Sequence, residues 1–93
     1  MTITVRLPGP LLPLAEGRGE VPLSFEGATV DDALRALWER FPGLRHRVLD
    51  DQGRLRRHVN VFVDRRSVKQ GAGLATGLAD GAVLSVIPAV SGG

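Results

Sequence analysis

The stretch of sequence that decides the fold is an apolar run near the end of the chain, Ala82-Val83-Leu84-Ser85-Val86-Ile87-Pro88. Leu84 and Val86 occupy one side of an alternating pattern, and Ser85 and Ile87 occupy the other, which is typical of a β-strand. A serine on the second side predicts that this side faces solvent. We therefore expect a strand with Leu84 and Val86 in the core and with Ile87 partly exposed.

Alternating patterns predict other strands at residues 2–7, 21–26 and 59–63, with a short strand at 67–69. The first two are close in sequence and favour a hairpin, with residues 11–19 as a loop. Pro22 has no backbone donor, which predicts an edge or outward-facing position for the second strand. In the third strand the valines form the expected buried side, which leaves Phe62 on the outward side beside Ile87.

One helix is predicted between the second and third strands. Thr29 is the expected N-cap, and Asp32 three residues later completes a variant of the capping box. Apolar residues then recur at helical spacing in a single stripe: Val30, Ala33, Leu34, Leu37, Trp38 and Phe41. Pro42-Gly43 ends the helix, and residues 44–55 are expected to form an irregular connection with a turn at residues 50–53.

This order of elements predicts an α+β fold. A single mixed sheet of about five strands, with one main helix packed across one face, satisfies the helix and the sheet together. That arrangement is the β-grasp, or ubiquitin-like, architecture, in which the first and last strands lie side by side at the centre of the sheet. We expect residues 1–88 to form this domain and residues 89–93 to form a flexible C-terminal tail.

Composition excludes several classes of protein. The 93 residues are 43% apolar and 24% charged, which is ordinary for one small globular domain. No apolar run is long enough to span a membrane and no secretion signal is evident, so a cytoplasmic location without membrane contact is expected. A net charge of +2 does not indicate a nucleic-acid-binding protein. The absence of cysteine excludes disulfides, thiolate metal sites and carrier chemistry on a thiol.

No catalytic set is evident in the domain. The adjacent carboxylates at 31–32 and 50–51 suit a helix N-terminus and a turn, because sequence neighbours do not face one another on a helix. His46 and His58 are too isolated to specify a metal site. The basic cluster at residues 54–58 could contact phosphates, but a solvated strand edge that opposes aggregation is the expected role.

The functional group that the sequence indicates is the terminal α-carboxylate of Gly93. Gly92 and Gly93 carry no Cβ, so this end can enter a narrow active site in another protein. The four residues from Val90 to Gly93 reach roughly 13 Å when extended. A terminal carboxylate with a pKa of about 3.5 is ionised at neutral pH and is a poor electrophile until a partner activates it. The alternative is an inert, frayed terminus.

The closing segments Leu78-Ala79-Asp80-Gly81 and Val86 to Gly93 resemble the MoaD/ThiS family of sulfur-carrier proteins, and the likeness covers essentially the whole chain. From Leu55 to Gly93 the sequence is most similar to the CysO-type carriers of thiocarboxylate-dependent cysteine biosynthesis. One departure is the turn Asp64-Arg65-Arg66-Ser67, where relatives often have an Asn-Gly-type turn.

The resemblance implies a carrier protein rather than an enzyme. An E1-like adenylating enzyme of the MoeB/ThiF type would use ATP to adenylate Gly93. A sulfur donor would then replace AMP and leave a thiocarboxylate, which delivers sulfur to an acceptor enzyme such as a cysteine synthase. The carrier would bind no cofactor itself, and Val90, Ser91 and Gly92 would thread the partner's active site.

A docking patch for these partners is expected at Phe62, Ile87 and Pro88, on the outward face of the sheet, because exposed apolar groups beside a functional segment mark interaction sites. The resemblance to the MoaD/ThiS family leaves other functions open. The chain could be the small subunit of molybdopterin synthase, or a carrier for the thiolation of thiazole, tRNA or a secondary metabolite. A ubiquitin-like protein modifier is a further alternative, and so is a basic β-grasp adaptor with an inert tail.

Overall fold

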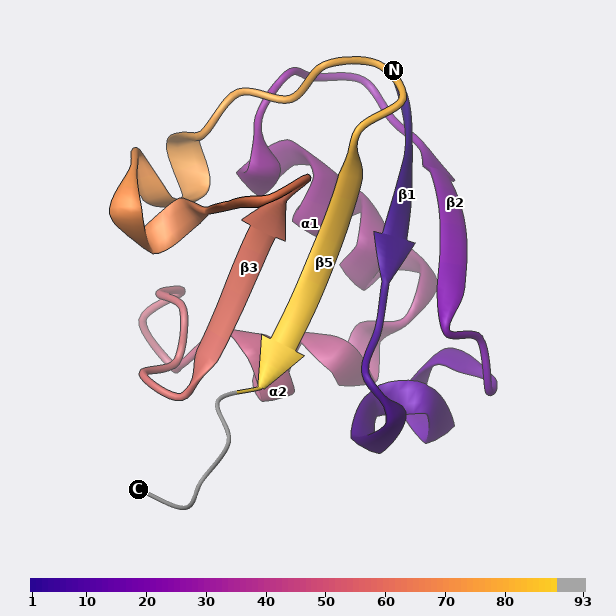
Figure 1. Cartoon of the computed structure of the whole chain (residues 1–93). Helices are drawn as coiled ribbons and strands as arrows, with labels where there is room; N and C mark the ends of the chain where they lie inside the picture. The colour runs from indigo at the N-terminus through magenta and orange to yellow at the C-terminus, as the bar shows by residue number, and fades with distance from the viewer. Residues whose placement is uncertain (89–93) are drawn as a thin grey trace.

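The computed structural model describes residues 1–88 (Figure 1). The elements in chain order are β1 (Thr2–Arg6), the 3₁₀ helix η1 (Gly9–Ala15), β2 (Glu20–Ser24), α1 (Val30–Arg40), η2 (Pro42–Leu44), α2 (Arg45–Val48), β3 (Val59–Val63), β4 (Arg66–Ser67), η3 (Val68–Gln70), η4 (Gly73–Ala75) and β5 (Val83–Pro88). None of the helices within residues 1–88 is long and apolar enough to cross a membrane.

The five strands form one mixed sheet in the order β2-β1-β5-β3-β4. β5 is the central strand, parallel to β1 and antiparallel to β3. Figure 1 shows α1 packed across one face of the sheet, while no helix of residues 1–88 covers the opposite face. This is the β-grasp architecture that the sequence predicts, with the first and last strands adjacent at the centre and Pro22 on an edge strand.

The core lies between the sheet and α1. The strands contribute Ile3, Val5, Val21, Leu23, Val59, Val61, Leu84 and Val86, and the helix contributes Val30, Ala33, Leu34 and Leu37, all buried. Phe41 closes the end of the helical stripe, whereas Trp38 is half-buried at its border. The alternation in the strands and the spacing in the helix therefore predict most of the core correctly; Val63, expected on the buried side of the third strand, is only half-buried.

The start of α1 is fixed by the predicted capping box. The Thr29 hydroxyl accepts a hydrogen bond from the backbone N of Asp32 (3.2 Å). Asp32 Oδ2 in turn accepts from the backbone N of Ala28 (3.0 Å) and of Thr29 (3.2 Å). The bond from Ala28, with those from Thr29, holds the pKa of the Asp32 carboxyl below its usual value. Gly27 has a φ of +137°, and a Cβ there would lie 2.5 Å from Asp32 Oδ2, so this approach requires glycine.

Three connections differ from the predictions. The expected loop at residues 11–19 is partly the helix η1, which ends where Glu16 adopts a left-handed φ of 56°. The expected irregular segment 44–55 starts at the last residue of η2 and contains the single turn α2; Leu44 at the end of η2 and Val48 in α2 are both buried. The short strand expected at 67–69 is instead β4 followed by η3. All three are too short to carry a helical or alternating period.

Candidate functional site

The chain leaves the sheet at Pro88, the last residue of the central strand, opposite Val59 at the start of β3. The predicted attachment residue Gly93 and the predicted threading residues Val90, Ser91 and Gly92 lie outside the described residues. Their roles therefore stay predictions. The structure defines the surroundings from which residues 89–93 depart.

On the uncovered face of the sheet, the half formed by β3 and β5 carries the large apolar side chains Phe62 and Ile87, beside the polar Asn60 and Ser85. Ile87 is the one exposed large apolar side chain among residues 1–88, with 45% of its surface accessible, as its position in the alternation predicts. Phe62 is half-buried on the same face. Because Phe62 pairs with Ser85 and Asn60 pairs with Ile87, Phe62 and Ile87 are diagonal neighbours, within reach of each other.

The other half of this face, formed by β1 and β2, is polar. The hydroxyls of Thr2 and Ser24 are 3.0 Å apart, and Arg6 Nε forms an ion pair with Glu20 Oε2 at 3.1 Å. An apolar partner surface would therefore fit over Phe62 and Ile87 and not over β1 and β2.

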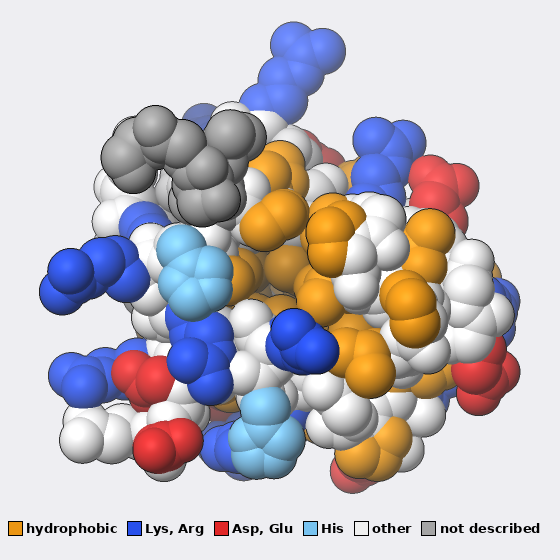
Figure 2. All heavy atoms as spheres, turned by 90° about the horizontal axis from the view of Figure 1, so that it is seen from below, with side chains coloured by type: hydrophobic (Ala, Val, Ile, Leu, Met, Phe, Trp, Pro, Cys, Tyr) orange, Lys and Arg blue, Asp and Glu red, His pale blue; other side chains and the backbone are white. Residues whose placement is uncertain are grey.

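Pro88 does not share this face, so its expected position on the outward face is wrong, while its role in docking stays a prediction. It has the same parity along β5 as the buried Val86 and faces the other way. There it lines an apolar hollow of about 160 Å³ with Val59, Val86 and residues of η1, and with Arg47 and His58 at the border. Figure 2 shows this end of the molecule: apolar side chains gather on one part, and basic and histidine side chains on the other.

The sequence patterns do not predict this hollow. The parity of Pro88 with Val86 is visible in the sequence and already places Pro88 on the side of the core. The contribution of Pro8, Pro10 and Leu11 to the lining has no such signal, because η1 was expected to be an irregular loop.

The basic cluster at residues 54–58 lies in the connection that leads into β3, so the expectation of a strand edge is wrong: the edge strands are β2 and β4. Arg56 Nε donates to the backbone O of His46 (2.7 Å). Lys69 Nζ donates to the backbone O of Arg56 and of Arg57 (3.0 Å each). These bonds hold the cluster beside the end of β5.

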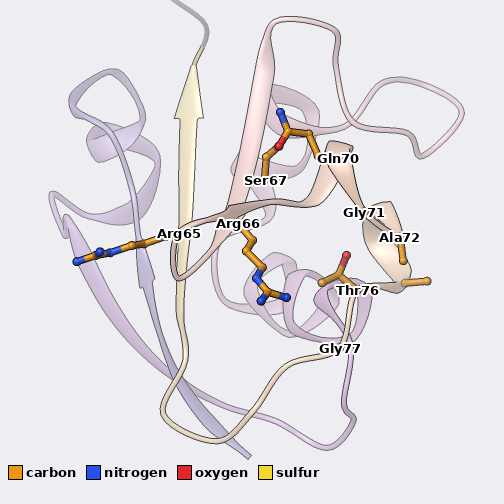
Figure 3. Close-up of a pocket in the computed structure, with 9 residues that line it drawn as sticks. Arg65, Arg66, Ser67, Gln70, Gly71, Ala72, Thr76 and Gly77 are labelled. Carbon is orange, nitrogen blue, oxygen red and sulfur yellow. The ribbon is translucent and has the colours of Figure 1, made fainter.

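A larger hollow of about 490 Å³ lies at the opposite end of β3, under β4 and η4. In Figure 3 Arg66 points towards Thr76, whereas Arg65 points away across the sheet. The hydroxyl of Ser67 donates a hydrogen bond to Asn60 Oδ1 (2.8 Å), and the hydroxyl of Thr76 donates one to the backbone O of Gly73 (2.6 Å). No group of three or more His, Cys, Asp or Glu side chains within residues 1–88 is placed to hold a metal ion.

The model of the ThiS family matches residues 5–93. The chain belongs to the ThiS family.

This ThiS-family chain is 36% identical over 95 residues to the sulfur carrier protein CysO of Mycobacterium tuberculosis, covering all of both chains. The crystal structure of that CysO matches 95% of this chain and 99% of its own with a TM-score of 0.85. The crystal structure of the Amycolatopsis orientalis BexX/CysO complex contains a chain that is 32% identical, with a TM-score of 0.86 and coverage of 98% and 99%. Small archaeal modifier protein 3 of Haloferax volcanii is 44% identical over 68 residues, 73% of each chain. These relatives are named as carriers and modifiers, not as catalysts, which supports a carrier acting as a protein co-substrate.

Proposed function

We propose that this chain is a sulfur carrier protein that supplies sulfur for cysteine biosynthesis. The observation that carries the proposal is the full-length identity of 36% to the CysO of Mycobacterium tuberculosis, whose name is that of a sulfur carrier. In the proposed cycle the Gly93 carboxylate attacks the α-phosphorus of ATP on a MoeB/ThiF-type adenylating enzyme and releases pyrophosphate. A sulfur donor then displaces AMP from the acyl adenylate and leaves a thiocarboxylate on Gly93.

The domain supplies position and recognition in this cycle, and the partner enzymes supply catalysis. The central strand β5 delivers residues 89–93 from a fixed point at Pro88. Phe62 and Ile87 form the docking patch on the uncovered face, because an exposed apolar pair beside a functional segment gains by being covered. Pro88 contributes from the other face, through the hollow that it lines.

Intact mass spectrometry of the protein purified from its own host tests the proposal. Exchange of one terminal oxygen for sulfur adds roughly 16 Da, and oxidation of Met1 must be excluded because it adds nearly the same mass. We expect the shift to appear on fragment ions that contain Gly93. The matched control is a variant without Gly93, which should lack the shift and fail to deliver sulfur. Full sulfur delivery by that variant contradicts the proposal.

The second candidate function is that of a ubiquitin-like protein modifier. The identity of 44% to small archaeal modifier protein 3 over 73% of the chain favours it. A modifier forms isopeptide bonds between its terminal glycine and lysines of other proteins. Conjugates that survive reductant and boiling, and that disappear when Gly93 is deleted, would assign this function.

A further inference from the structure

Charge is distributed very unevenly in this chain. Residues 45–69 contain eight arginines or lysines and three aspartates, a net charge of +5, whereas the rest of the chain carries −3. Residues 45–69 run through α2, β3 and β4, and the sheet order places β3 and β4 on one side of the central β5, with β1 and β2 on the other. A molecule of low net charge therefore has one strongly basic flank.

Part of this flank borders the point where the chain leaves the sheet. His58 precedes Val59, which pairs with Pro88, and Arg47 and His58 border the hollow that Pro88 lines. We call Arg47, Arg57 and His58, all exposed, the basic rim. Within residues 1–88 no ion pair engages the two arginines of the rim, whereas Arg54 nearby is paired with Asp50 at 3.6 Å.

The rim adjoins an apolar hollow, and this combination is typical of an interface. Arginine is enriched at protein interfaces, where its guanidinium group binds carboxylates in a bidentate geometry. A pocket that takes an apolar side chain, bordered by charged groups, commonly provides much of the binding energy. The hollow of about 160 Å³, with Arg47 and His58 in its lining, has both features.

We propose that the basic rim binds an acidic surface on the adenylating enzyme, around the opening through which residues 89–93 enter, and that an apolar side chain of that surface occupies the hollow. This inference rests on the proposed function. The carboxylates attract the basic flank over the Debye length and orient the carrier with the end of β5 towards the opening. The negative remainder of the chain turns away, so the uneven charge selects one orientation.

Nucleic acid fits this rim less well. The rest of the chain is negative, which opposes a polyanion along the molecule. Binding of single strands usually adds aromatic platforms for the bases. The exposed large apolar side chain within residues 1–88 is the aliphatic Ile87.

The test is the rate of carrier-dependent ATP–pyrophosphate exchange by the MoeB/ThiF-type adenylating enzyme of the same host. The pair Arg47→Glu and Arg57→Glu is compared with the control pair Arg65→Glu and Arg66→Glu. Both pairs change the charge equally, but the control lies near the far end of β3, about 13 Å along the strand. Thermal unfolding checks that both fold, and Arg47→Gln with Arg57→Gln serves as a milder rim variant.

At about 0.1 M NaCl we expect the rim pair to lower kcat/KM by about tenfold or more, mainly through KM, and the control pair to lower it by less than about threefold. The difference should shrink at about 1 M NaCl, where the Debye length falls from about 10 to about 3 Å. Equal effects of the two pairs, or a wild-type rate that does not depend on salt, would overturn the inference while leaving the proposed function intact.

Two further outcomes are informative. Failure of the enzyme to adenylate the wild-type carrier, together with absence of the mass shift on Gly93, overturns the proposed function and the inference with it. In the second outcome, a fluorescent oligonucleotide binds in a salt-dependent way, and the Arg47→Glu and Arg57→Glu pair abolishes that binding. This result would assign the rim to nucleic acid and overturn the proposal of an acidic partner.

Discussion

Replacement of Ile87 tests the docking patch most directly. Ile87 keeps 45% of its surface accessible, and complete burial of an isoleucine contributes about 1.5–3 kcal/mol. A partner that covers the remainder therefore gains up to about 0.7–1.4 kcal/mol from this side chain, or about 3- to 10-fold in kcat/KM. Ile87→Ala should lose up to that amount in the adenylation assay.

Ile87→Asp should lower kcat/KM further, because the partner would also cover a carboxylate that has no hydrogen-bonding or charged partner. That desolvation costs at least about 2 kcal/mol, which brings the total loss to about 100-fold or more in kcat/KM. The fold should tolerate the change, because Ile87 faces away from the core; we expect a loss of less than about 1 kcal/mol in the free energy of unfolding by urea.

The matched control is Ser24→Asp, which adds the same charge to the same sheet face on the edge strand β2. It should change kcat/KM by less than about twofold. If Ile87→Asp is folded and its kcat/KM stays within about twofold of the wild-type value, the patch is not a docking surface and the reasoning from exposure is refuted.

Other predictions concern stability. Thr29→Ala removes the N-cap acceptor and should cost about 1 kcal/mol in urea unfolding. Because the pKa of Asp32 is lowered in the folded state, the ionised carboxylate stabilises the fold above the unfolded pKa, and this stabilisation is lost as pH falls through the folded pKa. The free energy of unfolding by urea should therefore decline below about pH 4, and Asp32→Asn should remove this decline. Gly27→Ala should cost about 2 kcal/mol or more, because of the clash with Asp32 and the positive φ, and a stable variant would show that this approach relaxes easily. Asp64 has a φ of 55° and its Oδ1 accepts from the backbone N of Val83 (3.0 Å), so Asp64→Ala should lower the free energy of unfolding by about 1–2 kcal/mol, whereas Asp64→Asn should retain most of it.

Much of the fold could be predicted because the long elements carry a period. The apolar stripe along α1 fixes which side of the helix is buried. The alternation along β5 fixes which face of the sheet the helix covers. The capping box at Thr29 fixes where the helix begins. These are local properties of the chain, and the structure confirms them.

The short elements could not be predicted, because one turn of helix has too few residues to show a period. α2 has four residues and depends on the burial of Leu44 and Val48 against a core assembled from distant strands. The departure at Asp64 is now explained: an aspartate tolerates the left-handed turn, and its carboxylate also binds the first residue of β5.

Within the candidate site, exposure of Ile87 could be predicted, but the hollow could not. The hollow forms where η1, α2 and the start of β3 meet at the end of β5, and this meeting depends on tertiary packing. That Arg47 has no ion pair within residues 1–88 depends in the same way on which acidic residues the fold brings near. Which charged residues form ion pairs cannot be determined from the sequence alone.

The central place of β5 also has a mechanical consequence. A partner that draws in the chain beyond Pro88 pulls along the axis of a strand that is flanked on both sides, by β1 and by β3. The force then loads the backbone hydrogen bonds of both ladders together in shear, instead of opening them one at a time as it would at a peripheral strand. The domain would therefore resist extraction if its end were held under tension inside another protein.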